Sequence, residues 1–117
     1  MSREDLKKKV DLAFLSAFYG GMLTDKQRQI LSLHCEEDLS LSEIAEETGC
    51  SRQAVHDSLA RASARLIEME SALGAAARYR RMESGLQKAL SALKNGEFSQ
   101  AEQLMEKLLS QEVNDGV

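Results

Sequence analysis

The amino-acid sequence predicts an all-α protein, and three observations support this fold class. The 117 residues include 17 leucines and 14 alanines but only nine of the β-branched residues Val, Ile and Thr. Leu and Ala favour helices, whereas β-branched residues favour strands. Helix-capping patterns recur along the chain, and the absence of proline fits a chain built from capped helices. The length allows one domain with a small appendage.

Residues 1–22 are expected to form an N-terminal helix. Ser2 is a suitable N-cap, with Asp5 three residues later. One apolar stripe follows at helical spacing and comprises Leu6, Val10, Ala13 or Phe14, Ala17 and Phe18. Gly20 and Gly21 then end the helix.

Residues 23–73 are expected to form a helix-turn-helix unit whose last helix is extended. The stretches Thr24–Gln27 and Ser40–Glu43 each have the form of a capping box, so a helix is predicted to begin at both places. Gly49 suits the left-handed position after the second of these helices. Ser51 can cap the next helix almost at once.

The spacing of three small or apolar residues is typical of a helix-turn-helix. Ala45 lets two helices cross closely, Gly49 takes the positive φ of a tight turn, and Val55 fills the angle between the helices. The residues expected to complete this core are Ile44, Cys50 and Leu59. Together with the two capping boxes, this pattern predicts a helix-turn-helix without a wing.

The apolar spacing of the last helix in this unit is unusually regular. Its heptad seam consists of Val55, Leu59, Ala62, Leu66, Met69 and Leu73, and the stripe continues through Tyr79, Met82, Leu86, Leu90 and Leu93. Gly74 interrupts the pattern, so residues 51–94 form either one bent helix or two helices. The seam has more apolar surface than one short helix can cover, which predicts a homodimer.

Residues 74–117 are expected to form a C-terminal helical hairpin, packed on the same domain or on a dimer partner. The stretch Lys94–Gly96 is a predicted helix stop, and Ser99–Glu102 has the form of a third capping box. The last helix has an apolar stripe made of Leu104, Met105, Leu108 and Leu109.

The helix that follows Ser51 is the expected recognition helix, because the N-terminal end of that helix faces the DNA groove in helix-turn-helix proteins. The residues expected to contact nucleic acid are Ser51, Arg52, Gln53, His56, Arg61 and Arg65. Ser51 and the free amides of the first turn suit phosphate. Arg52 and Gln53 can form bidentate contacts with guanine and adenine edges, respectively. His56 suits a phosphate or a base, and the last two arginines can reach the backbone.

These residues also have ordinary structural interpretations. The first-turn side chains can simply be solvated. Arg61 can pair with Asp57 at the favourable i, i+4 spacing, and Arg65 can pair with Glu68. The sequence leaves both interpretations open.

Charge limits how this protein can bind its partners. The net charge of −4 argues against indiscriminate binding to nucleic acid or anionic membranes. Residues 24–66 have a net charge of −3, whereas residues 51–66 contain three Arg and one Asp. Because phosphate neutralisation supplies most non-specific affinity, a single domain is expected to bind DNA weakly. A second basic cluster, Arg78–Arg81, can contact a nucleic-acid backbone, although its tyrosine lies on the apolar stripe.

Several classes of protein are not expected. No apolar run reaches the ~18 residues of a membrane span. The charged N-terminus shows no secretion signal, so the expected location is the cytoplasm. The spacing of His34, Cys35, Cys50 and His56 fits no zinc site, and neither a phosphate-binding loop nor a nucleophile–base arrangement is present. The sequence therefore predicts no metal, no cofactor and no enzymatic activity.

The helix-turn-helix region resembles the bacterial YlxM family. The resemblance covers about residues 6–83, and its motifs are Leu23–Gln27, Asp38–Glu47 and, most specifically, Ser51–Val55. More broadly, the region is similar to the promoter-reading region four of sigma factors. The resemblance implies a small cytoplasmic DNA-binding or regulatory protein that forms a homodimer.

The same resemblance implies a link to the signal recognition particle pathway, because the genes of the family commonly lie beside that of the particle's GTPase. The expected function is therefore a helix-turn-helix regulatory protein that binds DNA and takes part in this pathway. The alternative is a protein-interaction adaptor that binds the particle's GTPase or its RNA-bound form and does not bind DNA.

Overall fold

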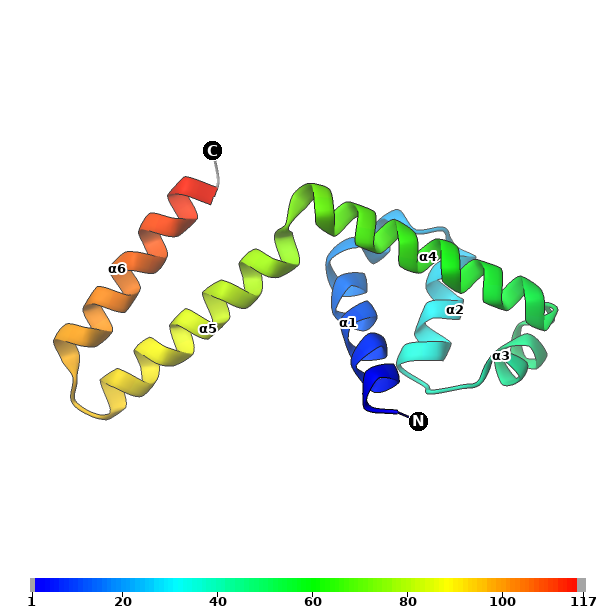
Figure 1. Cartoon of the computed structure of the whole chain (residues 1–117), viewed down its shortest axis with the longest axis horizontal. Coiled ribbons are helices and arrows are strands. Elements are labelled where there is room, and N and C mark those ends of the chain that lie inside the picture. Colours follow the sequence, from blue (N-terminus) through cyan, green and yellow to red (C-terminus); the bar gives the residue numbers. More distant parts are fainter. Residues whose placement is uncertain (1, 116–117) are drawn as a thin grey trace. The chain divides into compact units, whose positions relative to one another are not determined.

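The computed structural model describes residues 2–115, with side chains from Ser2 to Gln111, and over this range the chain forms six α-helices and no strand (Figure 1). The all-α prediction is confirmed. The helices are α1 (Arg3–Tyr19), α2 (Asp25–Cys35), α3 (Leu41–Thr48), α4 (Arg52–Leu73), α5 (Ala75–Lys94) and α6 (Phe98–Asp115), and a 3₁₀ turn, η1 (Gly20–Met22), follows α1. The chain divides into two compact units, one ending at Ala76 and the other beginning at Ala77.

Local capping determines where the helices of the first unit begin. Thr24 and Ser40 each accept a hydrogen bond at 3.1 Å from the backbone N–H three residues later. The side chains of Gln27 and Glu43 accept a hydrogen bond from the cap N–H in return. Gly49, with a φ of 74°, ends α3 in the left-handed conformation. Both predicted capping boxes and the predicted role of this glycine are therefore confirmed.

Helix α1 turns a different face to the core than its predicted apolar stripe suggests. Leu6 and Val10 are 55% and 57% exposed, whereas Leu12, Leu15 and Tyr19 pack in the core. Both sets recur every three or four residues, so they occupy neighbouring sectors of one helix. The predicted stripe is wrong as a guide to the core, because periodicity cannot decide which sector a neighbouring helix covers.

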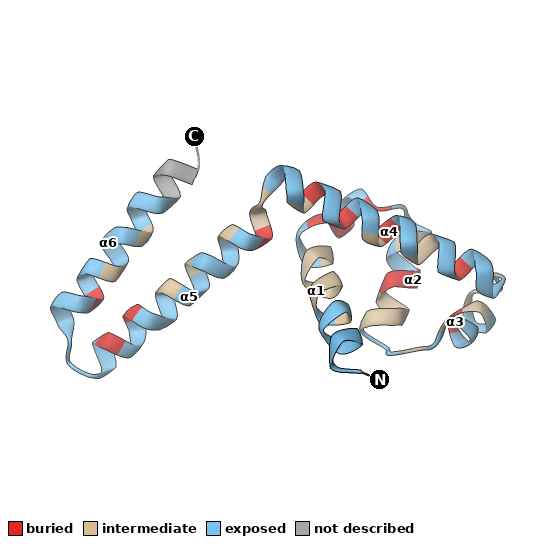
Figure 2. Cartoon of the chain, in the orientation of Figure 1, coloured by how far each residue is buried: buried red, intermediate tan, exposed pale blue. Residues whose placement is uncertain are grey.

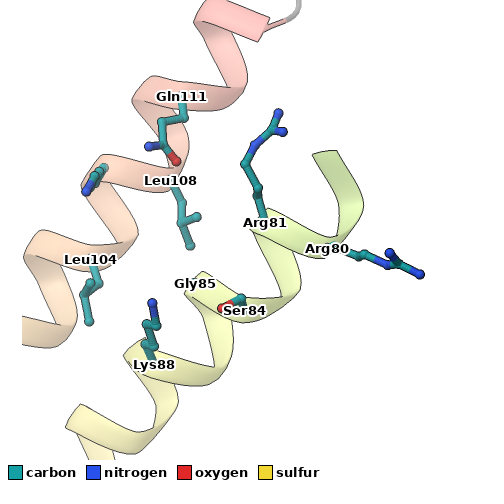
Figure 3. A pocket seen from close by; sticks show the side chains of 9 residues that line it. Arg80, Arg81, Ser84, Gly85, Lys88, Leu104, Leu108 and Gln111 are labelled. Carbon is teal, nitrogen blue, oxygen red and sulfur yellow. The ribbon is translucent and has the colours of Figure 1, made fainter. Parts of the chain in front are cut away.

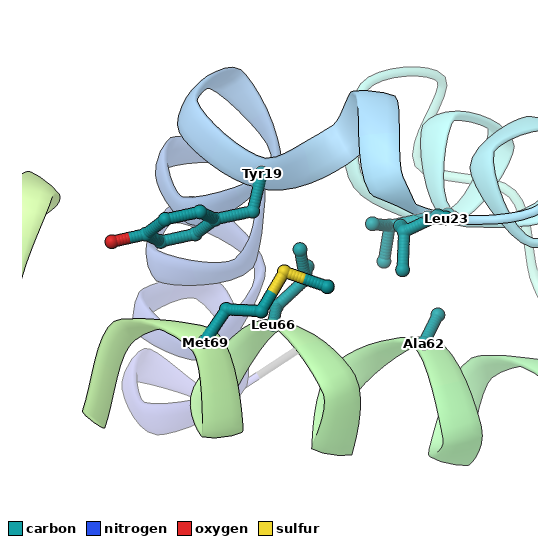
Figure 4. Packing of buried hydrophobic residues seen from close by; sticks show 6 residues of the cluster. Tyr19, Leu23, Ala62, Leu66 and Met69 are labelled. Carbon is teal, nitrogen blue, oxygen red and sulfur yellow. The ribbon is translucent and has the colours of Figure 1, made fainter. Parts of the chain in front are cut away.

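The main core of the first unit lies where α1, α2 and α4 meet. Figure 4 shows Leu66 and Met69 of α4 beside Tyr19, and Ala62 of the same helix pointing toward Leu23. These α4 residues belong to the predicted seam, and Figure 2 shows buried positions recurring along the helix. Leu73 is 59% exposed, so the buried part of the seam ends one turn earlier than predicted.

A second cluster holds the helix-turn-helix together. Ile30 of α2, Ile44 of α3 and Val55 of α4 are each at most 1% exposed and pack together. Ala45 and Cys50 pack against this cluster, as their spacing predicts. Because three helices each contribute a fully buried side chain, this cluster determines how α4 is held against α2 and α3.

A hydrogen-bonded clasp joins the end of α1 to the junction between α4 and α5. The Tyr19 hydroxyl donates to Glu70 Oε1 at 2.6 Å and accepts from the Ala75 N–H at 3.0 Å. Glu70 Oε1 also accepts from the Ala76 N–H at 3.0 Å. Gly74 ends α4 with a φ of 64°, so the junction separates two helices. The clasp therefore satisfies two of the amides that begin α5.

Tyr19→Phe is expected to lower the free energy of unfolding by about 1–3 kcal/mol, because the Ala75 N–H and the Glu70 carboxylate both lose a partner. Burial and the hydrogen bond to Glu70 raise the pKa of Tyr19 above its ordinary value. The protonated hydroxyl therefore contributes stability below about pH 10, and this contribution is lost as the pH rises further. Urea denaturation in neutral and alkaline buffers measures both effects.

Tyr79→Phe is the matched control for this experiment. Tyr79 is 47% exposed and lies in the second unit, so its substitution is expected to change stability by less than about 0.5 kcal/mol. The Tyr79 variant should keep the alkaline loss of stability, and the Tyr19 variant should lose most of it. A Tyr19 variant with the same alkaline profile as the wild type would show that the clasp is not its source.

The second unit consists of the rest of α5 and of α6. Gly96, the last residue of the predicted helix stop, has a φ of 77°. The Glu97 carbonyl then accepts the Ala101 N–H at 3.0 Å, so α6 already begins at Phe98. Ser99 therefore lies inside the first turn, and the capping box predicted there is wrong because Glu97 already provides the first helical acceptor.

Small residues form the contact between α5 and α6. Ala89, Ala92 and Ala101 are at most 6% exposed. An added Cβ at Gly85 would lie only 2.4 Å from Leu108 Cδ2, so the absence of a side chain lets Leu108 rest against α5. Seven large apolar side chains of this unit remain substantially exposed, and they are Tyr79, Leu86, Leu90, Leu93, Phe98, Met105 and Leu109. The hairpin therefore does not cover its own apolar stripe.

Candidate nucleic-acid interface

Two local features place the start of α4 at the surface of the first unit. Gly49 reverses the chain after α3, and the Ser51 hydroxyl then accepts a hydrogen bond from the Ala54 N–H at 3.0 Å. The connection between α3 and α4 is three residues long, which is typical of a helix-turn-helix. Because the first N–H groups of a helix have no partner inside it, this end of α4 suits an anion.

The six side chains predicted to contact nucleic acid all lie on the exposed part of α4 or at its cap. They are Ser51, Arg52, Gln53, His56, Arg61 and Arg65. The seam that packs on the core occupies the other side of the same helix. The burial of the seam therefore directs these polar side chains outward.

The carboxylate of Asp57 lies among the predicted contact residues. Gln53 Nε2 donates to Asp57 Oδ1 at 3.0 Å, and His56 Nδ1 lies 3.5 Å from the same oxygen. Among the residues that the structure describes, Asp57 contacts these two side chains rather than Arg61. One of the two N–H groups of Gln53 Nε2 is therefore engaged by Asp57.

The arginines of α4 differ in their surroundings. Arg65 Nη1 lies 4.0 Å from Glu68 Oε1, so the ion pair that the sequence allows between these two residues is present. Within the described part of the chain, neither Arg52 nor Arg61 forms an ion pair, and both are exposed. The guanidinium groups of these two residues are consequently accessible to a ligand.

Helix α3 is acidic, in contrast to the start of α4. Glu43, Glu46 and Glu47 are exposed, and α3 contains no basic residue. Hydrogen bonds from the N–H and the side chain of Ser40 lower the pKa of Glu43, so this carboxylate stays charged. In helix-turn-helix proteins the helix before the recognition helix crosses the DNA backbone. An acidic α3 therefore restricts favourable phosphate contacts to α4 and to other parts of the chain.

The described residues include potential metal ligands such as His34 and Cys35. No group of three or more potential metal-ligating side chains comes together there. His34 and Cys35 are partly buried at the end of α2, and burial lowers the pKa of His34 and raises that of Cys35. None of the helices over the same range has the length and apolar character needed to cross a membrane.

Sequence reasoning missed the partnership of Tyr19 with Glu70. The two residues are 51 positions apart, and neither capping nor periodicity relates positions at that separation. The available signals are Gly74, which marks the helix break, and the position of Glu70 beside the seam residue Met69.

One family is similar to this chain over most of its length. The model of the UPF0122 family, described as "Putative helix-turn-helix protein, YlxM / p13 like", matches residues 6–114. The match extends past residue 83, where the resemblance noted from the sequence ends, and so includes most of the hairpin.

Relatives named "UPF0122 protein" occur in several bacteria. The relative in Desulforamulus reducens is 38% identical over 93 residues, which are 80% of each chain. The relative in Clostridium botulinum is 37% identical over 89 residues, 76% of this chain and 82% of the relative. In Symbiobacterium thermophilum the identity is 40% over 90 residues, 77% of this chain and 84% of the relative. The chain therefore belongs to the UPF0122 family of YlxM/p13-like helix-turn-helix proteins.

Proposed function

We propose that this protein is a non-enzymatic regulatory protein that binds duplex DNA through α4 and takes part in the signal recognition particle pathway. The observation that carries the DNA-binding proposal is the exposure of Arg52 and Gln53 at the start of a capped helix within a helix-turn-helix. The connection to the particle comes from the resemblance to the YlxM family.

Recognition would combine phosphate and base contacts. The amides at the start of α4 suit a phosphate oxygen, and the dipole of the helix favours negative charge at this end. Arg52 presents the donor pair that matches a guanine edge, and the side-chain amide of Gln53 matches an adenine edge. Arg61 and Arg65 would contact the backbone, which fixes the register of the helix on the duplex.

A homodimer is part of this proposal. The hairpin leaves seven large apolar side chains exposed, among them Leu86 of α5 and Leu109 of α6. In a two-fold dimer, α5 of one copy can lie against α6 of the other and cover the exposed apolar side chains of both hairpins. A second copy also doubles the number of phosphate contacts, which offsets the weak binding expected of one domain.

Arg52→Ala is expected to weaken binding to a preferred duplex by about 1–3 kcal/mol and to relax the sequence preference at one base pair. The preferred duplex is obtained by selecting bound sequences from a random pool with the wild-type protein. Binding of this duplex and of scrambled duplexes is then measured by fluorescence anisotropy at several salt concentrations.

Arg28→Ala is the control for the loss of one positive charge. Arg28 lies on α2 and pairs with Asp25 at 2.6 Å, outside the proposed interface. The Arg28 variant should keep the wild-type preference and lose affinity only through the change in net charge. If the two variants bind all duplexes equally, base reading by Arg52 is refuted.

The alternative function is a protein-interaction adaptor, and the acidic surface of α3 favours it. Three exposed carboxylates beside the recognition helix repel phosphate and suit a basic protein surface. This adaptor would bind the GTPase of the signal recognition particle or its RNA-bound form. Failure to bind any duplex at low salt, combined with recovery of the particle in a pull-down from the native host, would leave only this function.

A further inference from the structure

The hairpin formed by α5 and α6 has two sides of different chemistry. One side has a pocket of about 270 Å³ that is lined by Met82, Leu86, Met105, Leu108 and Leu109. Another pocket of the hairpin, of about 400 Å³, has a lining that includes Arg80, Arg81, Lys88 and Lys107. Leu108 lines both pockets, so they lie on either side of the line along which α6 rests on α5.

Helix geometry explains why the basic pocket forms. Arg81, Gly85 and Lys88 follow the i, i+4, i+7 spacing that places side chains on one face of a helix. On α6, Lys107 stands beside Leu108, the residue that contacts Gly85. Figure 3 shows Leu108 directed toward α5 between Arg81 and Lys88, whereas Arg80 points away from α6. The close approach at Gly85 therefore brings the cations of two helices around one groove.

Among the residues that the structure describes, the charged side chains that line this groove are of one sign. Its described lining contains four basic residues and no acidic residue, although the chain as a whole has a net charge of −4. The cationic side chains are exposed, and each has the long flexible stem that lets a charge follow a moving or irregular anion. Such a surface suits a ligand with closely repeated negative charges more than a ligand of one fixed shape.

We infer that this groove, the basic groove, is a second phosphate-binding surface that holds the phosphodiester backbone of a nucleic acid. The inference rests on the proposed function, because α4 has few positive charges of its own and α3 opposes phosphate. Double-stranded nucleic acid carries one charge per about 1.7 Å of axis, a density that an acidic peptide does not match. The basic groove supplies affinity without base recognition, and the apolar side of the hairpin remains available to a second copy.

Single substitutions of the two lysines test this inference. Lys88→Gln and Lys107→Gln each remove one charge from the groove, and Lys94→Gln removes the same charge from the end of α5, outside the groove lining. Binding of each full-length variant to a random-sequence DNA duplex is measured between about 50 and 200 mM salt. The slope of log K against log salt is expected to become shallower by about 0.9 for each groove variant and to stay unchanged for Lys94→Gln.

Two further binding measurements identify the ligand. An RNA duplex of equal length that shows the same loss of slope would extend the site to both nucleic acids, because they share the phosphodiester group. Polyglutamate that binds as tightly as DNA, with the same dependence on Lys88 and Lys107, would overturn the assignment to nucleic acid. Equal slopes for all three lysine variants would also overturn it, provided that thermal denaturation shows them to be folded.

Failure of this inference is distinguishable from failure of the proposed function. Loss of sequence preference in Arg52→Ala tests reading by α4, whereas the salt slope on random DNA tests the basic groove. If no duplex is preferred but the groove variants still lose slope, the DNA-reading proposal fails and the phosphate-binding surface remains.

Discussion

Ile44→Ala should lower the free energy of unfolding of the first unit by about 2–5 kcal/mol, a large share of the total stability of a small domain. Ile44 is completely buried and packs against Ile30 and Val55 of two other helices. Truncation leaves a cavity that this closely packed cluster can fill only by shifting α3 or α4. Because α4 presents the predicted contact residues, DNA binding should weaken in the same variant. Urea denaturation followed by circular dichroism measures the loss of stability.

Ile67→Ala provides a control with the same chemical change. Ile67 lies on α4 but is 57% exposed, so its truncation is expected to change stability by less than about 0.5 kcal/mol. A loss of less than about 1 kcal/mol for Ile44→Ala, close to the control value, would show that the cluster repacks freely. The assignment of this cluster as the part that holds the helix-turn-helix together would then fail.

Leu86→Glu should convert the proposed dimer into a monomer and lower the affinity for a two-site duplex by about 10²–10⁴-fold, because avidity between the two copies is lost. Leu86 lines the apolar pocket of the hairpin and is 51% exposed. A carboxylate at this position would be buried without a partner in a dimer, whereas a monomer leaves it in water. Light scattering and sedimentation at micromolar protein measure the mass, and anisotropy measures the affinity.

Leu6→Glu is the matched control for the dimer experiment. Leu6 is 55% exposed and lies on α1, in the other unit. This variant should keep the mass of the wild type and most of its affinity. A wild-type protein that is already monomeric at micromolar concentration would contradict the dimer directly. Loss of the dimer in the Leu6 variant alone would show that the interface lies on α1 and not on the hairpin.

The capping motifs show how much of this fold is readable from neighbouring residues. The cap at Thr24 and the turn at Gly49 depend on contacts within four residues, so residue type and spacing are sufficient to predict them. The same reasoning is wrong at Ser99, where the Glu97 carbonyl starts the helix two residues earlier. Glu97 and Ser99 are both near the start of α6, and the sequence pattern alone does not show which of them precedes the first helical residue.

Some features of the candidate interface are also predictable from the sequence, and others are not. The sequence identifies the start of α4 and the six predicted contact residues at its cap and along it, because their spacing relative to the seam is visible in one helix. It does not show that Asp57 engages Gln53 and His56, or that Lys88 and Lys107 line one groove. Those relations depend on side-chain rotamers and on the approach of a second helix.

By itself, the sequence determines the fold class, the caps at Thr24, Ser40 and Ser51 and the helix-turn-helix, because these follow from interactions between residues close in the chain. Tertiary structure alone decides which face of α1 is buried. It also brings Tyr19 to Glu70, 51 residues away, and gives the hairpin an apolar side and a basic side. The physical reason is that burial is a property of a pair of surfaces. A sequence shows each surface of a helix, but only packing selects the one that meets a neighbour.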